Sequence, residues 1–472
     1  MEQFKSNLAS AELAASYFFC GIGGSGMLPL AMIVRACGAT VAGSDRSLDQ
    51  GRIADKFAWL ERQGIALFAQ DGSGVVSADQ TVVASAAIED SVPDIARARE
   101  LGCARMTRAE LNAALFNAAG TRIGVAGTSG KSTVTGMIGW ILHRAGLEPT
   151  VMNGAVMRNF AGPDSPFASA LAGGPDCYVS EVDESDGSIA LYAPTVAVVT
   201  NISLDHKSMD ELLTLFGNFA AKAAVAVVNA DDDASGPLRC SSRAVYFGFD
   251  AAADFRASDF RPGPAGSDFM VEAEGKRHAA RLSMPGRHNV ANALAAIAAT
   301  NAAGIPVADA IAALADFAGL ARRFEIVGEA GGITVVDDFA HNPDKVAATL
   351  AALATLPGRV LLFFQPHGYG PLRQMGKELA ASFAAGMRDG DRLCVCDPVY
   401  FGGTVDRTMG SEAFVADIIA GGGHATHLPT REVCGEAMLA EARAGDRIVV
   451  LGARDDTLTE FADGLLQALR RR

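Results

Sequence analysis

The sequence Arg-Ile-Gly-Val-Ala-Gly-Thr-Ser-Gly-Lys-Ser-Thr occupies residues 122–133. Its first half is typical of a short apolar strand, and Gly127 and Gly130 predict a loop whose backbone N–H groups turn inward. The apolar residues over 134–145 predict a helix with its N-terminus at the loop, where the helix dipole favours an anion. Strand, glycine loop and helix in this order indicate a phosphate-binding site.

The loop ends in side chains suited to a nucleotide. Lys131 can reach β- and γ-phosphates, and Ser132 or Thr133 can hold Mg²⁺. The standard P-loop spacing would place a glycine at position 125, where this chain has Val125. The alternative, a chance Gly-Lys-Ser in an ordinary loop, is disfavoured because all three predicted elements lie where phosphate binding needs them.

Length and composition favour a large α/β protein. At 472 residues the chain predicts about three domains of roughly 150 residues. A net charge of −14 argues against a general nucleic-acid or anionic-membrane binder. An anionic substrate must therefore meet a local cluster of Lys, Arg and N–H groups.

The cysteines and the first residues predict a cytoplasmic protein without membrane insertion. None of the 8 cysteines forms a Cys-x-x-Cys pair, which favours a reducing compartment. Cys394 and Cys396 would share a strand face, where filling a core is favoured over metal binding. The uncharged run over 17–34 is interrupted by glycines and Pro29, and charged residues precede it, so neither a membrane span nor a signal peptide is expected.

The N-terminal segment also predicts a nucleotide-binding unit. The run Gly21-Ile-Gly-Gly-Ser-Gly26 follows an apolar strand and precedes an apolar helix, and Asp45 lies about 20 residues further on. By itself this β-α-β pattern predicts a nucleotide ligand, with NAD as the usual first interpretation.

The rest of the chain continues the alternation of strands and helices. Residues 244–283 differ, because their alternation and Gly/Pro punctuation predict a small antiparallel insertion. We expect three consecutive α/β domains: an N-terminal Rossmann-like domain, a central P-loop-type mononucleotide-binding sheet and a C-terminal Rossmann-like domain. Their expected bounds are 1–119, 120–319 and 320–472. Buried strands are expected at 81–85, 177–183, 196–201, 224–229, 334–339, 359–364, 392–396 and 447–451, with a helix from about 286 to 303.

Two polar groups follow strands of the central segment. Glu181 opens an acidic run that reaches Asp186, and carboxylates beside a phosphate loop commonly supply a Mg²⁺ ligand. His206 follows the strand at 196–201, at the kind of strand end where open α/β sheets bind ligands. The alternatives are a solvated acidic loop and a structural histidine.

Taken together, the motifs resemble those of the Mur ligases in order and over nearly the whole chain. The motifs are Gly127-Thr-Ser-Gly-Lys-Ser-Thr133, Glu181-Val-Asp-Glu-Ser-Asp186, Thr200-Asn201 with Asp205-His206, Gly286-Arg-His-Asn289 with Asn292, Arg322-Arg-Phe324 and Asp337-Asp-Phe-Ala-His-Asn-Pro343. Within the family, the alanine-adding branch is most similar. It is matched by the 21–26 run, Gly43-Ser-Asp45, Ser85-Ala-Ala-Ile88 and Phe364-Gln-Pro-His367.

The resemblance implies ATP-dependent amide formation with ATP and Mg²⁺. A carboxylate of UDP-N-acetylmuramate would attack the γ-phosphorus to give an acyl phosphate, which the amine of an amino acid then displaces. The N-terminal domain would bind the UDP part of the substrate, so the NAD interpretation falls. The glycine loop would take the shorter Gly-Thr-x-Gly-Lys-Ser form, which accounts for Val125.

The resemblance also implies roles for individual residues. Lys131, Glu181 and His206 are the expected catalytic residues, and Ser132, Glu181 and His206 the expected metal ligands. Nucleotide contacts are expected from Gly127, Thr128, Ser129, Gly130, Lys131, Ser132, Thr133, His288, Asn289, Asn292, Arg323 and Asp338. Substrate contacts are expected from Gly23, Gly24, Ser25, Gly26, Ser44, Asp45, Ser85, His341, His367 and Arg373. Because Arg323 and Asp338 lie in the third domain, binding is expected to draw the domains together.

The departures from the family pattern concentrate in the third domain, which receives the amino acid in this family. Gly368 and Pro371 stand where the alanine-adding branch has arginines, Phe339 replaces a tyrosine, and Ala453-Arg-Asp-Asp456 replaces a glycine-rich end. In the central domain, Ser129 and Ser132 of the phosphate loop also depart from the pattern of the alanine-adding branch. Lys207 and Lys222 are assigned no functional role. Alternatives therefore stay open: a ligase that adds a peptide or another amino acid, a non-catalytic nucleotide-binding relative and, weakest, an NAD-dependent oxidoreductase. The oligomeric state is not predicted.

Overall fold

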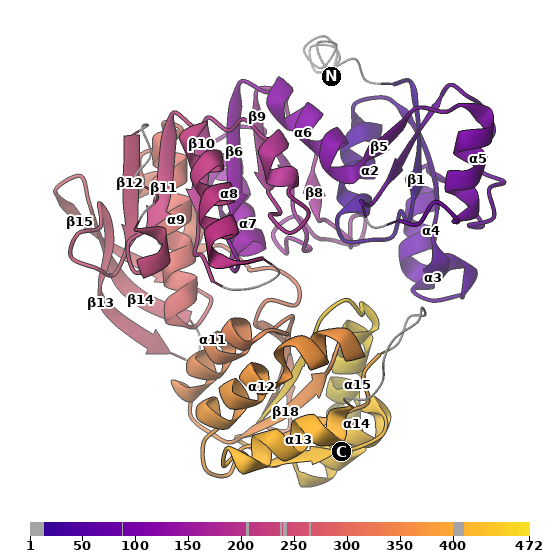
Figure 1. The fold of residues 1–472 in the computed structure, drawn as a ribbon. Coiled ribbons are helices and arrows are strands. Elements are labelled where there is room, and N and C mark those ends of the chain that lie inside the picture. The colour runs from indigo at the N-terminus through magenta and orange to yellow at the C-terminus, as the bar shows by residue number, and fades with distance from the viewer. Residues whose placement is uncertain are drawn as a thin grey trace. The chain divides into compact units, whose positions relative to one another are not determined.

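The computed structural model describes residues 14–86, 88–203, 207–236, 238, 243–263, 266–399 and 410–472. The chain divides into two compact units, which we treat separately. The first comprises 1–260, 268–283 and 289–319, and the second comprises 261–267, 284–288 and 320–472. Figure 1 shows the three sheets, two in the first unit and one in the second. The predicted three-part α/β architecture is confirmed.

The N-terminal sheet has five parallel strands in the order β3-β2-β1-β4-β5. Its central strands are short and mostly buried, as expected for strands covered on both faces. The chain switches sides of the sheet between β3 and β4, so β1 and β4 flank the point where such sheets bind ligands. The strands are β1 Ser16–Cys20, β2 Thr40–Ser44, β3 Ala66–Phe68, β4 Gln80–Ala84 and β5 Arg105–Thr107, and the helices are α2 Met27–Ala36, α3 Arg46–Asp49, α4 Ala54–Arg62, α5 Pro93–Leu101 and α6 Arg108–Ala118.

The central sheet has ten strands in the order β15-β14-β13-β12-β11-β10-β6-β9-β7-β8. The run from β12 to β7 is parallel, so its carboxyl ends meet at one edge. The strands are β6 Thr121–Ala126, β7 Thr150–Met152, β8 Ala170–Leu171, β9 Cys177–Glu181, β10 Val196–Val199, β11 Val225–Asn229, β12 Arg243–Gly248, β13 Phe255–Gly263, β14 Gly266–Ala273 and β15 Lys276–Leu282. The helices are α7 Lys131–Arg144, η2 Ser188–Leu191, α8 Met209–Ala221, η3 Asp233–Ser235, α9 Arg287–Ala302 and α10 Val307–Ala315.

The predicted insertion over 244–283 is not separate from this sheet. β12 pairs in parallel with β11, and β13 pairs in parallel with β12, so the region extends the main sheet. β14 follows β13 after only two residues, a connection too short for a parallel pair. The prediction of an antiparallel insertion over 244–283 is therefore wrong for β12 and its pair with β13, which continue the parallel sheet. The alternating sequence reflects strands with one solvated face at the sheet edge.

The sheet of the second unit has six strands in the order β16-β17-β21-β18-β19-β20, with only the β16–β17 pair antiparallel among the pairs described. Two apolar cores cover its faces, one beneath α11, α12 and α13 and one beneath α14 and α15. The strands are β16 Glu325–Ala330, β17 Ile333–Asp338, β18 Val360–Gln365, β19 Arg392–Val395, β20 Ala425–His427 and β21 Arg447–Gly452. The helices are α11 Pro343–Ala354, α12 Tyr369–Gly386, α13 Ser411–Ala420, α14 Arg431–Glu441 and α15 Thr457–Arg470.

Two sequence predictions concern the burial of Cys394 and Cys396 and the presence of a membrane-spanning helix. Cys396 is buried in the core beneath α14 and α15, and Cys394 packs against that core. No group of three or more His, Cys, Asp or Glu side chains suited to a metal ion occurs among the described residues. Within the same part of the chain, no helix combines the length and apolar character that crossing a membrane would need.

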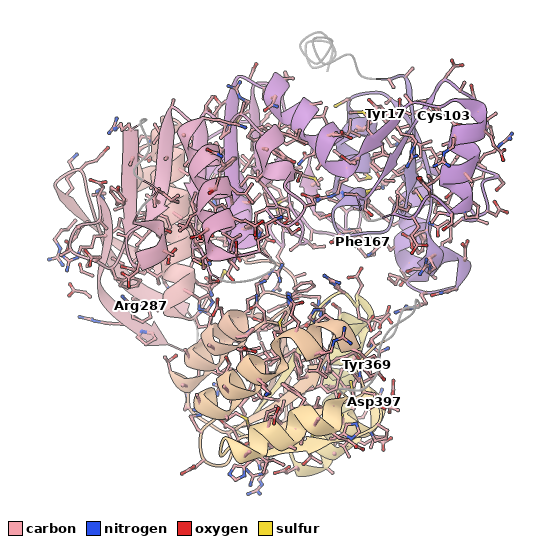
Figure 2. The ribbon with its side chains drawn as sticks, in the orientation of Figure 1. Tyr17, Cys103, Phe167, Arg287, Tyr369 and Asp397 are labelled. Atoms are coloured by element: carbon pink, nitrogen blue, oxygen red, sulfur yellow. The ribbon has the colours of Figure 1, made fainter. Side chains whose placement is uncertain are left out.

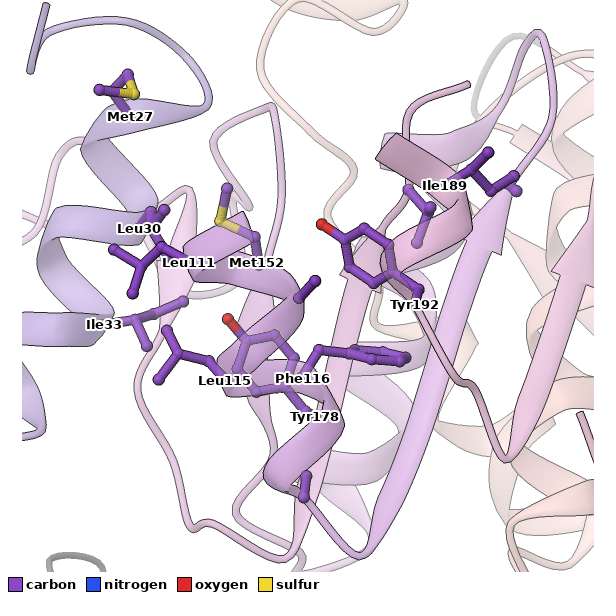
Figure 3. Packing of buried hydrophobic residues seen from close by; sticks show 14 of the residues in the cluster. Met27, Leu30, Ile33, Leu111, Leu115, Phe116, Met152, Tyr178, Ile189 and Tyr192 are labelled. Atoms are coloured by element: carbon purple, nitrogen blue, oxygen red, sulfur yellow. The ribbon is translucent and has the colours of Figure 1, made fainter. Parts of the chain in front are cut away.

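The two sheets of the first unit share one apolar core. Figure 3 shows Leu30 and Ile33 of α2 facing Leu111 and Leu115 of α6, with Tyr178 of β9 beyond them. A second join lies where Figure 2 labels Phe167, whose ring contacts the ring of Trp59 edge-on at 5.5 Å. Because α6 packs on both sheets, it fixes the N-terminal sheet against the central one.

A buried polar network lies at the centre of this packing. The side-chain amide of Asn112 on α6 donates to Ser180 Oγ at 3.0 Å and to Tyr192 Oη at 2.8 Å. Its carbonyl oxygen accepts from Tyr178 Oη at 2.8 Å. Ser180 Oγ in turn donates to the backbone oxygen of Glu181 at 2.8 Å. Since all of these hydrogen-bonding partners are satisfied, the network ties α6 to the end of β9.

Replacing Asn112 with alanine should destabilise the first unit strongly. Three buried hydroxyls would lose a partner, and each unsatisfied buried group costs about 1–3 kcal/mol, so we expect a loss of about 3 kcal/mol or more in the free energy of unfolding. Urea unfolding followed by tryptophan fluorescence measures it, because Trp59 and Trp140 lie in this unit.

Asn117→Ala on the same helix is the matched control. Asn117 also makes two side-chain hydrogen bonds, with Leu191 O and Ala193 N, but it is exposed, so water replaces them. An Asn112 variant no less stable than the Asn117 variant would contradict the assignment of a stabilising role to the buried network.

Candidate functional site

The predicted substrate residues of the N-terminal sheet follow three adjacent strands. The 21–26 run follows β1, Ser44 ends β2 with Asp45 next, and Ser85 follows β4. Carboxyl ends of neighbouring parallel strands lie at one edge of the sheet, which is the usual ligand-binding edge. The fold therefore brings these residues together.

Asp45 holds the glycine loop. Its carboxylate accepts a hydrogen bond from Gly23 N at 2.8 Å and one from Ser47 N at 2.8 Å. Lys56 donates to the Gly23 carbonyl at 3.3 Å. A side chain at Gly26 would lie 2.9 Å from the guanidinium of Arg108, so this arginine borders the loop. Sequence reasoning missed Arg108, whose only signal is that it opens a helix after β5.

The other predicted contacts of this sheet differ in exposure. Gly24, Ser25 and Ser85 are exposed, whereas Ser44 is fully buried. The Ser44 hydroxyl donates to Asp94 at 2.5 Å, and Asp94 also accepts from Gly72 N at 2.9 Å. The side chain of Ser44 is therefore part of the local structure, and a ligand contact through it would require an exchange of partners.

The phosphate loop begins at Gly127, as the shorter form of the loop predicts, but it ends earlier than the sequence suggested. Val125 lies inside β6 and is fully buried, so the loop starts at Gly127 and position 125 needs no glycine. The prediction that the helix begins at Val134 is wrong, because α7 begins at Lys131. Gly130 adopts a left-handed conformation with φ +87° and ends the loop. Lys131, Ser132 and Thr133 thus form the first helical turn, whose N–H groups have no intrahelical acceptor.

Gly127 is required by its surroundings. Its φ is +128°, and a side chain there would overlap the Thr200 hydroxyl and press on the backbone of Asn201. Thr200 Oγ1 donates to Ser129 O at 2.6 Å, and Asn201 Oδ1 accepts from Ser129 N at 2.9 Å. The residues that follow β10 therefore hold the loop in place.

Two predicted nucleotide contacts, Thr128 and Ser129, differ in how their hydroxyls are satisfied within the protein. Thr128 N donates to Asn201 O at 3.1 Å, and the Thr128 hydroxyl donates to Ser203 O at 3.1 Å. The Ser129 hydroxyl is buried and has no hydrogen-bond partner among the described residues. Thr128 and Ser129 thus shape the loop, and an unsatisfied hydroxyl remains inside it.

The acidic run after β9 contacts the first turn of α7. Lys131 Nζ donates to Gly127 O at 2.7 Å and to Glu184 Oε2 at 2.9 Å. Burial by itself lowers the pKa of Lys131, but the carboxylates of Glu184, Asp183 and Glu181 outweigh burial and hold the pKa above its ordinary value. Burial also works against ionisation of Asp183, yet Lys131 and hydrogen bonds from Ser185 keep the Asp183 pKa below its usual range. Lys131 is therefore a fully charged ammonium among carboxylates.

Ser132 and Glu181 form the oxygen-rich part of the site. Ser132 Oγ donates to Glu181 Oε2 at 2.7 Å, and Asn153 Nδ2 donates to the Ser132 carbonyl oxygen at 2.9 Å. A side chain at Gly154 would overlap Glu181 Oε1, so the glycine leaves space for this carboxylate. Hydroxyl and carboxylate oxygens are ligands that Mg²⁺ prefers. His206, the third predicted ligand, lies outside the described residues.

The predicted adenine contacts lie at the start of α9. Asn289 is buried, and its Oδ1 accepts from Asn292 Nδ2 at 3.4 Å. A side chain at Gly130 would lie 2.6 Å from Asn292 Oδ1, so Asn292 borders the phosphate loop. His288 is half-buried and belongs to the short segment 284–288, which groups with the second unit. Figure 2 labels its neighbour Arg287, the first residue of α9.

In the second unit, Arg322 and Arg323 flank one aromatic ring. The guanidinium of Arg323 lies 4.5 Å from the ring centre of Phe339, and that of Arg322 lies 5.2 Å from it. Arg322 is buried and donates to the carbonyls of Asp455 and Gly452. Phe339 thus positions Arg323 by a cation–π contact, for which a ring without a hydroxyl suffices.

Asp338 is held by the backbone beside these arginines. Its carboxylate accepts from Phe324 N at 2.8 Å and from Ala340 N at 2.7 Å. Burial raises the pKa of Asp338 to about 6, against the effect of these bonds and of Arg323. Asp338 and Arg323 are therefore brought together, as their predicted shared role requires.

The predicted acceptor residues lie near the end of β18. The rings of His341 and His367 are 4.9 Å apart and nearly perpendicular, and His341 Nδ1 contacts Phe339 O at 2.8 Å. Gly368 precedes α12 with φ +134°, a conformation that an arginine rarely adopts. Arg373 is exposed on α12, the helix that begins at Tyr369, which Figure 2 labels.

Lys207 and Lys222, which have no assigned role, lie at opposite ends of α8. Lys222 follows α8 and is exposed, and its ammonium donates to Ala190 O at 2.6 Å and to Tyr192 O at 3.3 Å. Lys207 is half-buried beside the start of α8. Lys222 therefore fastens α8 to η2.

Sequence reasoning assigned no role to Glu184, Asn153 or Asn201, although each contacts the phosphate-loop region. All three follow a strand of the central sheet at its carboxyl end, and this position is the signal that could have found them. Their partners depend on which strands are neighbours, a property of the fold and not of local sequence.

Comparison with known proteins identifies the family. Three family descriptions match in succession: "Mur ligase family, catalytic domain" over 16–119, "Mur ligase middle domain" over 125–300, and "Mur ligase, glutamate ligase domain" over 322–454. The UDP-N-acetylmuramate–L-alanine ligase of Streptomyces coelicolor is 36% identical over 456 residues, covering 93% of this chain and 95% of that protein. The enzyme of the same name from Dinoroseobacter shibae is 36% identical, with 95% and 96% covered.

Solved structures share the fold. The UDP-N-acetylmuramate–alanine ligase MurC of Thermotoga maritima superimposes with a TM-score of 0.79 at 24% identity, covering 97% of this chain and 99% of that one. A murein peptide ligase of Psychrobacter arcticus gives a TM-score of 0.71 at 25% identity with the same coverage. The matching family descriptions and the relatives that are similar over nearly their whole length show together that the chain belongs to the Mur ligase family.

Proposed function

We propose that this protein is an ATP-dependent ligase that joins the carboxylate of UDP-N-acetylmuramate to the amine of L-alanine in peptidoglycan precursor synthesis. The observation that carries the proposal is the arrangement of Lys131, Ser132 and Glu181 at the end of the glycine loop. The names of the relatives that match over more than nine-tenths of the chain support the choice of substrates.

The proposed reaction has two steps. The substrate carboxylate attacks the γ-phosphorus of ATP and ADP leaves, which gives an acyl phosphate. The amine then attacks the acyl carbon, inorganic phosphate leaves, and the amine loses a proton. Lys131 and the N–H groups of the first turn of α7 would stabilise the negative charge on the phosphoryl oxygens during transfer. Asn292 would border the adenine, and Arg323 and Asp338 would contact the phosphates and the ribose.

The oxygen donors at the loop fit a magnesium ion. Ser132 and Glu181 would hold Mg²⁺, which supplies charge neutralisation to the phosphates when bound. Mg²⁺ is usually bound by one or two protein oxygens and takes its remaining ligands from water and phosphate, so Ser132 and Glu181 are enough to hold it. His206 stays a predicted ligand.

The N-terminal sheet would hold the UDP part of the substrate, and the second unit would receive the amino acid. Asp45 orders the glycine loop that would face the diphosphate. We retain 1–119, 120–319 and 320–472 as the proposed domains, with the substrate, nucleotide and acceptor roles in that order. The described cysteines are free thiols, which supports the proposal that the protein acts in the cytoplasm.

A second candidate is a ligase of the same kind with a different acceptor, a peptide or another amino acid. The observation that favours it is local: Gly368 and Pro371 replace two family arginines, and the backbone at Gly368 suits glycine. The structural similarity to a murein peptide ligase agrees with this candidate as well. The acceptor must therefore be tested directly.

Phosphate release from ATP should depend on UDP-N-acetylmuramate together with an amine acceptor. We expect L-alanine to stimulate release most strongly in a panel of amino acids and the peptidoglycan tripeptide. Lys131→Ala should lower kcat about 100-fold or more, because it removes the ammonium whose positive charge stabilises the transferred phosphoryl group. Lys276→Ala, which removes an exposed lysine of the edge strand β15, is the control and should leave turnover unchanged.

The outcomes separate the candidates. Stimulation by the peptide alone selects the second candidate, and the absence of stimulation by every amine refutes both. A Lys131 variant with near-normal turnover would show that the catalytic site has been misplaced.

Arg373 should control the acceptor and not the nucleotide. If its guanidinium binds the acceptor carboxylate, Arg373→Ala raises KM for the amino acid by about 10–100-fold, the worth of one charge-assisted contact, and leaves KM for ATP within twofold. Lys377→Ala removes a charge one turn further along α12 and serves as the control. Equal effects of the two variants on the amino-acid KM would exclude this role for Arg373.

The proposed ATP contacts are divided between the two compact units, since Lys131 lies in the first and Arg323 in the second. Catalysis should therefore draw the units together, which also protects an acyl phosphate from water. Small-angle scattering should show a smaller radius of gyration with a non-hydrolysable ATP analogue and UDP-N-acetylmuramate than without them. An unchanged radius at saturating ligand would contradict closure.

A further inference from the structure

The ammonium of Lys131 is directed at the protein's own oxygens. Two of its three N–H donors go to Gly127 O and Glu184 Oε2, at 2.7 and 2.9 Å. The side chain of Lys131 is 20% exposed and that of Glu184 only 6% exposed. The pair is thus formed between groups of the protein itself and is largely shielded from water.

The other carboxylates of the run have different partners. Glu181 accepts from the Ser132 hydroxyl, and Asp183 accepts from Ser185 N at 3.0 Å. Among the hydrogen bonds described, only Glu184 places a carboxylate oxygen on the Lys131 ammonium. Glu184 is therefore the group that fixes where this ammonium lies, while its neighbours add negative charge around it.

Separating the Lys131 ammonium from the Glu184 carboxylate costs free energy because the pair is shielded from water. Attraction between two charges grows as water is excluded, and removing one partner leaves the other charge buried. Only one N–H donor of Lys131 is left beside the two that go to Gly127 O and Glu184, so a triphosphate that needs a second donor, or needs the ammonium to turn toward its β- and γ-phosphates, must displace Glu184. Phosphate oxygens and the Glu184 carboxylate therefore seek the same ammonium.

We propose that Glu184 is a positioning residue that holds Lys131 in the nucleotide-free protein and competes with the phosphates of ATP for its ammonium. The proposal rests on the proposed ATP site. Binding then requires Lys131 to move from the Glu184 carboxylate to a phosphate oxygen. The larger the fraction of protein in which Glu184 holds Lys131, the lower the apparent affinity for nucleotide. Glu184 thereby sets how tightly the site takes ATP and releases ADP.

Calorimetric titration with a Mg²⁺-bound, non-hydrolysable ATP analogue tests the proposal without any acceptor. Glu184→Gln keeps the size of the side chain and removes its charge, so it should tighten binding by about 3–10-fold if the held state dominates. Glu148→Gln, an exposed carboxylate of the same unit, is the matched control and should change affinity less than twofold.

Two further variants separate competition from simple charge repulsion. Glu184→Asp keeps the charge but shortens the reach to Lys131, so competition predicts tighter binding and repulsion predicts no change. In a Lys131→Ala background, Glu184→Gln should have no effect on affinity, because there is no ammonium to compete for. An equal gain with and without Lys131, or no gain from either Glu184 variant, overturns the proposal.

Steady-state kinetics give an independent readout. Competition predicts a lower KM for ATP in Glu184→Gln without a rise in kcat, whereas a purely structural role predicts a lower melting temperature and no gain in affinity. If the unmodified protein fails to bind the analogue at all, the proposed ATP site itself is refuted. That result is distinct from a protein that binds the analogue but does not respond to the Glu184 variants.

Discussion

The close approach of the glycine loop to the end of β10 is the constraint on which the site depends. Gly127 lies against Thr200 and Asn201 so closely that no side chain fits, and hydrogen bonds from both residues fix Ser129. With the loop pinned there, α7 begins at Lys131 and its first turn lies beside β9, the neighbour of β6 on the other side. The position of Lys131 beside the acidic run therefore follows from backbone packing.

Electrostatics then explain how an acidic protein can offer a site to anionic ligands. The chain carries a net charge of −14, yet the loop combines the N-terminal turn of α7 with one buried ammonium. The carboxylates after β9 keep that ammonium charged and hold it in one place. If ATP binds here as proposed, Mg²⁺ would offset the negative charge of the carboxylates around the phosphates. We therefore expect the site to take the metal–nucleotide complex in preference to the free nucleotide.

The sequence predicted the parts of the fold and site that local patterns encode. Apolar strands, the two glycine loops and the order of the domains could be predicted, because each depends on residues close together in the chain. The start of α7 was predicted wrongly, and so was the antiparallel arrangement at β12, since a left-handed Gly130 and the parallel pairing of β12 with β11 are set by tertiary contacts. The Lys131–Glu184 pair needed the fold, because it joins the first turn of α7 to the segment that follows β9.

The nucleotide and acceptor ends of the proposed site are built in different ways. At the nucleotide end, Gly127 and Gly130 are forced by close contacts, so a change there disturbs the backbone itself. At the acceptor end, Arg373 lies exposed on a helix surface, where exchanging one side chain leaves the fold intact. At Gly368 the backbone itself favours glycine, because a φ of +134° suits a residue without a side chain. On the proposed assignment, a change of acceptor therefore disturbs the backbone less than a change of the nucleotide site does, which agrees with the position of Gly368 and Pro371 in the second unit.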